Sequence, residues 1–136
     1  MVYNPFTTGL LNDTTSTRGL VGRVLHADVG PNGVPTNWTI LDPGTVGDPR
    51  GSAQNNLVLE FLGDYVYAAA TNDFGVAVWN DTRNAADCPA IDRWRPDVQT
   101  ANAEGTTAPA PPAPQQDCPA NFGNSDIYGG SFADPS

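Results

Sequence analysis

The densest group of ligand-binding side chains in the sequence is the triplet Arg93-Trp94-Arg95. Two guanidinium groups can donate paired hydrogen bonds to an anion, and the indole ring offers a flat surface on which a sugar can stack. The triplet could therefore form a sugar- or anion-binding tip. In the opposite interpretation, which we favour, Trp94 packs inward and fixes the surrounding loop to the body of the protein.

Metal and nucleophilic chemistry are narrowly limited by the residue types present. His26 is the single histidine, so a His-rich metal site is excluded, and a Ser-His-Asp triad would have to use a residue in the middle of an expected strand. Asp81, Asn84 and Asp87 could supply oxygen ligands to Ca²⁺, but their spacing lacks the Asp-x-Asp-x-Asp-Gly pattern. We expect no metal site and no cofactor, with Ca²⁺ as the one ion that this loop could hold.

The charge balance excludes several partners. The 136 residues include 15 acidic and 6 basic side chains, giving a net charge of −9, and every basic residue is an arginine. Because phosphate affinity comes mainly from Lys and Arg, we expect no nucleic-acid partner. The absence of lysine excludes a P-loop and Schiff-base chemistry. The sequence contains no stretch of about 20 apolar residues, so we expect no membrane insertion.

The two cysteines indicate an oxidising compartment. Cys88 and Cys118 each lie in the tetrapeptide Asp-Cys-Pro-Ala, and together they flank a Pro/Ala-rich segment at residues 104–114. We predict a disulfide between them and a secreted or cell-surface location. The alternative is a pair of free buried thiols in a cytosolic protein. The start of the sequence lacks the pattern of a leader, so a secreted protein would have its leader outside this sequence.

Alternating apolar and polar residues predict an all-β chain. The strand-like segments are residues 19–28, 37–41, 57–62, 65–70, 74–79 and 125–132. The turn at residues 30–33 should join the first two segments into a hairpin. We expect Trp38 and Trp79 in the core and no helix of ordinary length, only a single helical turn at residues 91–95.

The pattern of segments divides the chain into three regions. Residues 1–18 form a polar N-terminal arm. Residues 19–56 form a hairpin followed by a connecting loop. Residues 57–136 form a sheet into which a long loop, residues 81–124, is inserted.

Three segments resemble the last blade of sialidase-like β-propellers with bacterial neuraminidase repeats. They are Phe61-Leu62-Gly63-Asp64-Tyr65, Val76-Ala77-Val78-Trp79-Asn80-Asp81-Thr82-Arg83-Asn84 and Ser125-Asp126-Ile127-Tyr128. The resemblance covers roughly residues 57–132, and the hairpin at residues 19–41 fits the outer part of the preceding blade. It implies antiparallel four-stranded blades of a partial β-propeller, about one and a half to two blades, with a long disulfide-closed loop.

The resemblance also implies where a site would lie. It places the segment that contains Asp64 and Tyr65 on the same face as the loop that begins with Asp81 and Arg83, which makes these four residues the catalytic candidates. Sialidases use a tyrosine nucleophile and hold the substrate carboxylate with arginines. We do not transfer these roles, because the acid/base Asp and the Tyr-Glu pair would come largely from blades outside this chain. A packing or rim position for Tyr65, and a pairing of Arg83 with Asp81 or with a loop carbonyl, are simpler.

The chain is too short for a complete propeller, and isolated blades leave their faces open. It is therefore a terminal fragment of a larger propeller, a unit that copies of itself complete, or a sheet folded back as a small sandwich. We expect a glycan-binding or glycan-processing extracellular protein; whether it is an enzyme stays open. The alternative is a structural assembly module, a homo-oligomeric β-sheet protein without catalytic activity. The expected partners are a glycan or other copies of the same chain.

Overall fold

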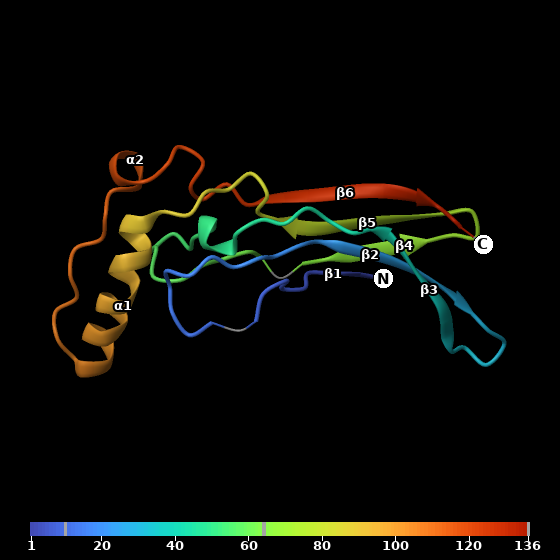
Figure 1. Ribbon diagram of the computed structural model, residues 1–136, viewed down its shortest axis with the longest axis horizontal. Coiled ribbons are helices and arrows are strands. Elements are labelled where there is room, and N and C mark those ends of the chain that lie inside the picture. The colour runs from blue at the N-terminus through green and yellow to red at the C-terminus, as the bar shows by residue number, and fades with distance from the viewer. Residues whose placement is uncertain (10, 64, 136) are drawn as a thin grey trace.

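The chain forms two separate three-stranded antiparallel sheets, with a helix at one end of the molecule (Figure 1). The computed structural model describes residues 1–9, 11–63 and 65–135. Among these residues the elements are β1 (Val2–Tyr3), β2 (Arg23–Val29), β3 (Pro35–Asp42), a 3₁₀ turn η1 (Pro49–Gly51), β4 (Tyr67–Ala70), β5 (Phe74–Asp81), α1 (Pro89–Glu104), α2 (Pro114–Asp117) and β6 (Asp126–Ala133). The sequence predicted an all-β chain, and the chain is indeed mostly β but also contains helices.

The first sheet has the order β1-β2-β3 and contains the predicted hairpin. The turn between β2 and β3 uses Gly33 at φ 75°, a conformation that glycine adopts without steric cost. Its backbone N–H donates to the Gly30 carbonyl at 2.9 Å. The N-terminal arm joins this sheet through β1, where Val2 lies opposite Val24.

The second sheet has the order β4-β5-β6, and its central strand separates two chemically different faces. Ala77 and Trp79 point inward and are each only 3% exposed. Phe74, Val76 and Val78 point to the opposite side and are 39–49% exposed. The alternation predicted for β5 is therefore confirmed, and Trp79 lies in the core as expected.

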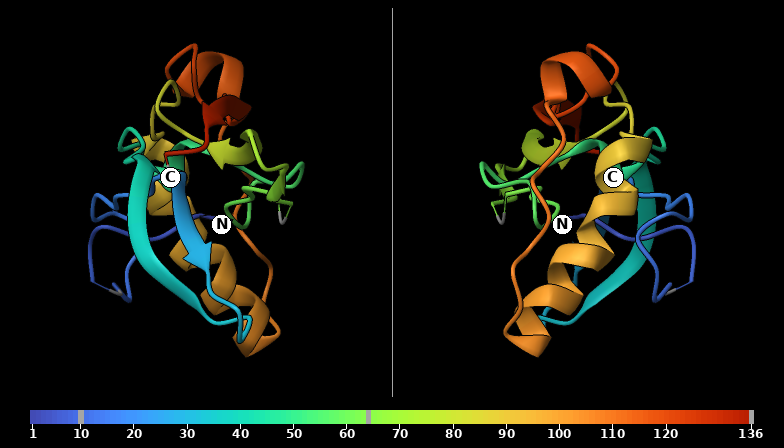
Figure 2. Two further views of the ribbon diagram at one scale, coloured as in Figure 1. Left: turned by 90° about the vertical axis from the view of Figure 1, so that its right-hand side faces the viewer. Right: turned by 90° about the vertical axis from the view of Figure 1, so that its left-hand side faces the viewer.

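The two sheets pack through their inner faces and form separate layers when the molecule is viewed along its long axis (Figure 2). Val24 of β2 meets Ala77 and Trp79 of β5 in the core. The indole of Trp79 also lies over Gly22, where a Cβ atom would come within 1.8 Å of the ring. A glycine is therefore required at position 22. The two layers are not a sealed sandwich, because the far side of the β4-β5-β6 sheet stays exposed.

The expectation that the chain lacks an ordinary helix was wrong, because α1 runs for 16 residues. Pro96 lies inside this helix and cannot donate to the carbonyl of Asp92. The hydroxyl of Thr14, in the N-terminal arm, donates to that carbonyl instead at 2.5 Å. The helix ends at Gly105 in the left-handed conformation at φ 68°. None of the helices described is long and apolar enough to cross a membrane.

Three other expectations need correction. Residues 57–62 form a loop instead of a strand, and Leu57 adopts a positive φ of 64° there. Because that segment pairs with no neighbour in the described sheets, the β4-β5-β6 sheet has three strands where the blade comparison implied four. The β1-β2-β3 sheet also has three strands. Trp38 is 52% exposed and does not belong to the core, since the strand that carries it is exposed along most of its length.

Trp79 and Trp38 allow a direct test of the interface between the sheets. Trp79→Ala should lower the free energy of unfolding by about 3–5 kcal/mol, because it leaves a cavity where the sheets meet. The matched change Trp38→Ala should cost less than about 0.5 kcal/mol, since that side chain is half exposed. Urea unfolding followed by circular dichroism measures both. Equal losses for the two variants would contradict the packing described here.

Candidate functional site

Four polar residues meet where β5 ends and β6 begins, and we call them the end cluster: Asp81, Arg83, Asn84 and Tyr128. Arg83 donates to the Asp81 carboxylate from its backbone N–H at 2.8 Å, from Nε at 2.9 Å and from Nη2 at 2.6 Å. The Arg83 guanidinium lies 4.2 Å from the centre of the Tyr128 ring. Asn84 Nδ2 donates to the Tyr128 hydroxyl at 2.6 Å.

The electrostatics of the end cluster keep both members of its ion pair charged. Burial of Asp81 opposes its ionisation, but hydrogen bonds from Arg83 outweigh burial and hold the pKa of Asp81 below its usual range. The same hydrogen bonds raise the pKa of Arg83. Asp81 also accepts from Trp79 Nε1 at 3.3 Å, so its oxygens are fully engaged. Asp81 is therefore held as a carboxylate, and it orients the Arg83 guanidinium.

Of the remaining catalytic candidates, Tyr65 lies just before β4, the strand that pairs with β5. Tyr65 is 66% exposed, and its ring stacks on that of Tyr67 with the centroids 6.3 Å apart. Asp64 lies outside the described residues. The structure thus brings together Asp81 and Arg83 among the four candidates, and the catalytic roles of all four stay predictions.

Helix α1 places the residues of the triplet in three different environments. Arg93 is exposed. Trp94 is largely buried, and its Nε1 donates to the Pro109 carbonyl at 3.0 Å, which fastens the Pro/Ala-rich segment to the helix. Arg95 is 1% exposed. This arrangement agrees with the interpretation in which Trp94 fixes the loop, and it separates the three side chains that a binding tip would need to present together.

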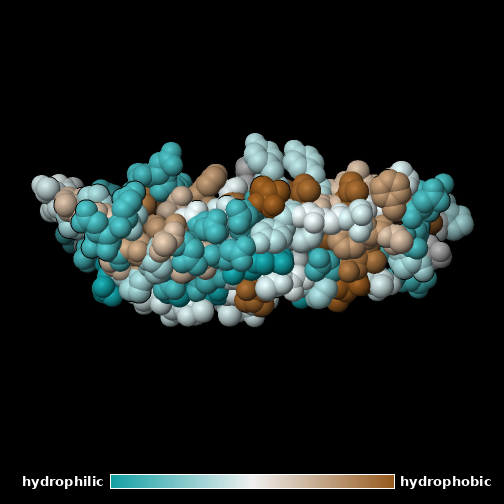
Figure 3. All heavy atoms as spheres, turned by 90° about the horizontal axis from the view of Figure 1, so that it is seen from above, coloured by the Kyte–Doolittle hydropathy of each residue, from teal (hydrophilic) through white to brown (hydrophobic). Residues whose placement is uncertain are grey.

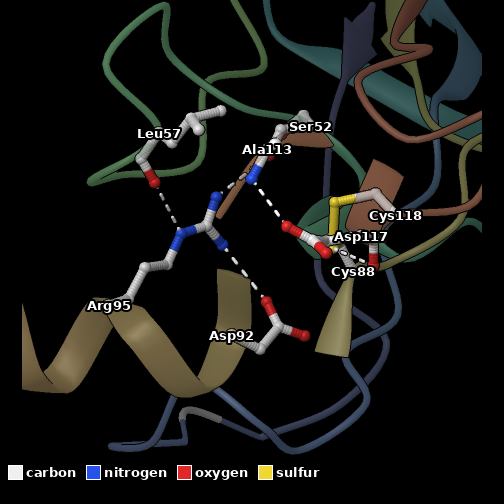
Figure 4. The surroundings of a disulfide bond; sticks show 8 residues. All are labelled: Ser52, Leu57, Cys88, Asp92, Arg95, Ala113, Asp117 and Cys118. Carbon is white, nitrogen blue, oxygen red and sulfur yellow. Dashed lines mark hydrogen bonds and ion pairs between the residues drawn. A yellow bond between two sulfur atoms is a disulfide. The ribbon is translucent and has the colours of Figure 1, made fainter. Parts of the chain in front are cut away.

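Beneath α1 lies a group of ion pairs that the sequence analysis missed, and we call it the buried ionic cluster. Its members are Arg18, Asp48, Arg50, Glu60, Asp87, Asp92 and Arg95. Asp92 lies 3.2 Å from Arg50. It lies 3.4 Å from Arg95, a contact that Figure 4 shows. The members come from four distant segments, so no local pattern in the sequence indicates that they meet.

Asp92 is the most perturbed group of the buried ionic cluster. Burial raises the pKa of Asp92 to about 6, against the opposing influence of Arg50 and Arg95. Asp87 and Glu60 add to the increase, because further negative charge disfavours a second carboxylate nearby. Four carboxylates face three arginines in the cluster, so a proton on Asp92 would balance its charge.

The predicted disulfide is confirmed, because Cys88 and Cys118 are bonded to each other (Figure 4). It joins the start of α1 to the end of α2 and so closes the loop that contains the Pro/Ala-rich segment. At the same place the Ala113 N–H donates to the Asp117 carboxylate at 2.7 Å. A disulfide is compatible with an extracellular location.

Two of the residues that could have offered oxygens to Ca²⁺ are engaged with arginines. Asp81 pairs with Arg83 at 2.6 Å, and Asp87 lies 3.4 Å from Arg50. Within residues 1–9, 11–63 and 65–135, no group of three or more His, Cys, Asp or Glu side chains is arranged to hold a metal ion.

No protein-family model, curated protein or solved structure matches this chain. The support for a function therefore comes from the residues and geometry described above.

The raised pKa of Asp92 predicts a specific pH dependence of stability. Between about pH 4 and pH 6 the folded protein holds a proton that the unfolded chain has released. The contribution of Asp92 is therefore fully present below about pH 4 and is lost as the pH rises through 6. Relative to Asp92→Asn, which cannot titrate, the wild-type free energy of unfolding should fall by about 2 kcal/mol from pH 4 to pH 7.

Chemical denaturation across this pH range measures that difference. Asp97→Asn is the matched control, because Asp97 lies on the same helix and is exposed. Its stability should follow the wild type at every pH. Parallel curves for the wild type and Asp92→Asn would show that Asp92 ionises normally and would contradict the assignment.

Proposed function

We propose that this chain belongs to a glycan-binding or glycan-processing extracellular protein of sialidase-like propeller ancestry, in which its two sheets are consecutive blades. One observation carries the proposal: the far side of the β4-β5-β6 sheet is apolar and exposed. We call this surface the outer face. Its exposed residues are all uncharged and all but one are non-polar or aromatic: Tyr67, Ala69, Phe74, Val76, Val78, Ile127, Gly129, Ser131 and Ala133.

The outer face supports the blade interpretation because of how blades pack. Each blade of a propeller covers both of its faces with the neighbouring blades. Two consecutive blades would bury the faces between them, as Val24 and Trp79 are buried here, and would leave their far faces open. Apolar residues accordingly gather over the strand-rich part of the molecule, while polar residues predominate towards the α1 end (Figure 3). Further blades, from a longer chain or from copies of this one, would cover the outer face.

The end cluster supports the glycan part of the proposal. It lies where the long loop leaves β5, and it combines a guanidinium, a phenol and a carboxamide, groups that hydrogen-bond to sugar hydroxyls and carboxylates. About a quarter of the Arg83 side chain reaches solvent, while Asp81 holds it in place. The cluster suits an anionic sugar, with Arg83 as the residue that contacts the carboxylate.

The proposal is tested by titrating the chain with sialyllactose and with lactose and following binding by NMR. Arg83→Gln should weaken sialyllactose binding at least tenfold, because it removes the cation, and Asn84→Ala should weaken it while leaving the Asp81–Arg83 pair intact. Arg93→Gln is the control, since Arg93 is an exposed arginine on α1. Sialyllactose binding that is absent, or unaffected by Arg83→Gln and Asn84→Ala, would contradict the proposal.

The outer face also favours a second candidate function, that of an assembly module. β4 and β6 are the edge strands of their sheet, and open edges can pair with strands of other chains. Phe74, Val76 and Val78 offer an apolar surface that a second copy could cover by packing sheet against sheet. In this alternative the occupant of the outer face is another copy of the chain.

Self-association through the outer face is measurable by sedimentation over a range of concentrations. Val76→Lys should weaken association at least tenfold, because it places a charge in the middle of an uncharged face. Val34→Lys is the matched control, since Val34 is similarly exposed but lies in the β2–β3 turn. A wild-type chain that stays monomeric at high micromolar concentration would exclude the assembly function.

A further inference from the structure

The loop between η1 and β4 contains a shallow hollow whose lining is chemically distinctive. The hollow measures about 400 Å³, within the range of small-molecule sites, and is lined by Ala53, Gln54, Asn55, Asn56 and Phe61. Three of these five residues are carboxamides, one is aromatic, and all are uncharged. In a chain of net charge −9 this is a neutral polar surface beside an exposed ring.

This combination matches the surface of a sugar ring. Each carboxamide offers two N–H donors and one carbonyl acceptor, and neighbouring hydroxyls of a pyranose offer the complementary groups. Phe61 is 55% exposed, so its ring is available for the apolar C–H face of the sugar. Asn55 and Asn56 are also exposed, which leaves their amides accessible to a ligand.

The backbone beneath the hollow is held in an unusual conformation. Leu57 has a φ of 64°, which is uncommon for a residue other than glycine and persists only where the surroundings enforce it. The Leu57 N–H donates to the Gln54 carbonyl at 2.9 Å, and the Gln54 N–H donates to the Leu59 carbonyl at 3.0 Å. These bonds fold the loop tightly around the carboxamides.

A buried arginine holds this loop from below (Figure 4). Arg95 donates from Nε to the Leu57 carbonyl at 3.0 Å and from Nη2 to the Ser52 carbonyl at 3.4 Å. Arg95 is in turn fixed by Asp92 at 3.4 Å and by Glu60 at 3.6 Å. A buried guanidinium is costly to desolvate, and here two of its donors fix the backbone of the loop that carries the hollow. The carboxamides are therefore presented on a preorganised backbone, which lowers the entropic cost of binding.

We propose that this hollow binds one uncharged pyranose residue of a glycan. The inference rests on the proposed glycan function and deepens it: the end cluster takes the anionic sugar, and the hollow takes a neutral one. The uncharged lining selects against acidic sugars, because it supplies no cation to a carboxylate and the acidic chain repels one. Phe61 stacks on the ring, and the carboxamides contact its hydroxyls.

The test uses the complete chain and the methyl glycosides of galactose, glucose and mannose, with glucuronate as the anionic comparison. Binding is followed by NMR shifts of the side-chain amide groups of Gln54, Asn55 and Asn56. At least one neutral glycoside should shift these signals, and glucuronate should not. Phe61→Ala and Asn55→Ala should each weaken binding at least tenfold.

Two control variants distinguish a specific binding site from a general effect of removing exposed side chains. Phe6→Ala removes a phenylalanine of similar exposure, 59%, and Asn124→Ala removes an exposed carboxamide elsewhere. Both should bind the neutral glycoside as the wild type does. Equal losses for these controls would overturn the site, and so would the absence of shifts with every neutral glycoside.

The measurements distinguish failure of this inference from failure of the proposed function. Sialyllactose binding that persists at the end cluster without any response at the hollow would overturn this inference and leave the proposed function standing. The galactose and glucose of sialyllactose can themselves occupy the hollow. Neutral glycosides bound at the hollow, together with sialyllactose binding that Arg83→Gln leaves unchanged, would therefore support the hollow and overturn the role of Arg83.

Discussion

The packing of two antiparallel sheets through their inner faces is the constraint on which the rest of the structure depends. A three-stranded sheet has two faces, and this chain covers one face of the β4-β5-β6 sheet. The covered face carries Ala77 and Trp79, and β2 supplies Val24 against them. The other face carries residues of the same apolar kind, and they are left exposed. This asymmetry is why both a blade in a larger ring and a self-assembling module are consistent functions for the chain.

The α1 end of the molecule is also held together by ion pairs and a disulfide. Ile91, Trp94 and Val98 of α1 are buried there. The buried ionic cluster, the disulfide and the hydrogen bond between Trp94 and Pro109 connect the segments as well. Buried charges are weak contributors to stability but strong contributors to geometry, because each must keep its partners. Arg95 illustrates this, since its position fixes the loop of the hollow. The α1 end therefore presents the candidate binding surfaces, and the strand-rich end presents the exposed apolar face.

The sequence predicts the features that depend on local pattern and misses those that depend on distant partners. Alternation along β5 and the glycine turn before β3 are local, and both appear as expected. Pro96 argued against a helix, but the Thr14 hydroxyl supplies the missing donor from the other end of the chain. Residues 57–62 have the composition of a strand, yet Arg95 holds Leu57 in a loop. The pairing of Asp81 with Arg83 was anticipated because the two are close in the sequence. The residues of the hollow were divided between a connecting loop and an expected strand, so nothing in the sequence indicated that they meet.

The central claim is that the outer face is a packing surface, and oxidative footprinting tests it most directly. Hydroxyl radicals label exposed aromatic side chains, so the labelling rates of Tyr67 and Phe74 report whether the outer face is covered. In the isolated chain these rates should fall several-fold as the concentration rises, because copies then cover the face, while the rate for Phe6 stays constant. Unchanged rates for Tyr67 and Phe74 in a monomer that melts cooperatively would contradict the account.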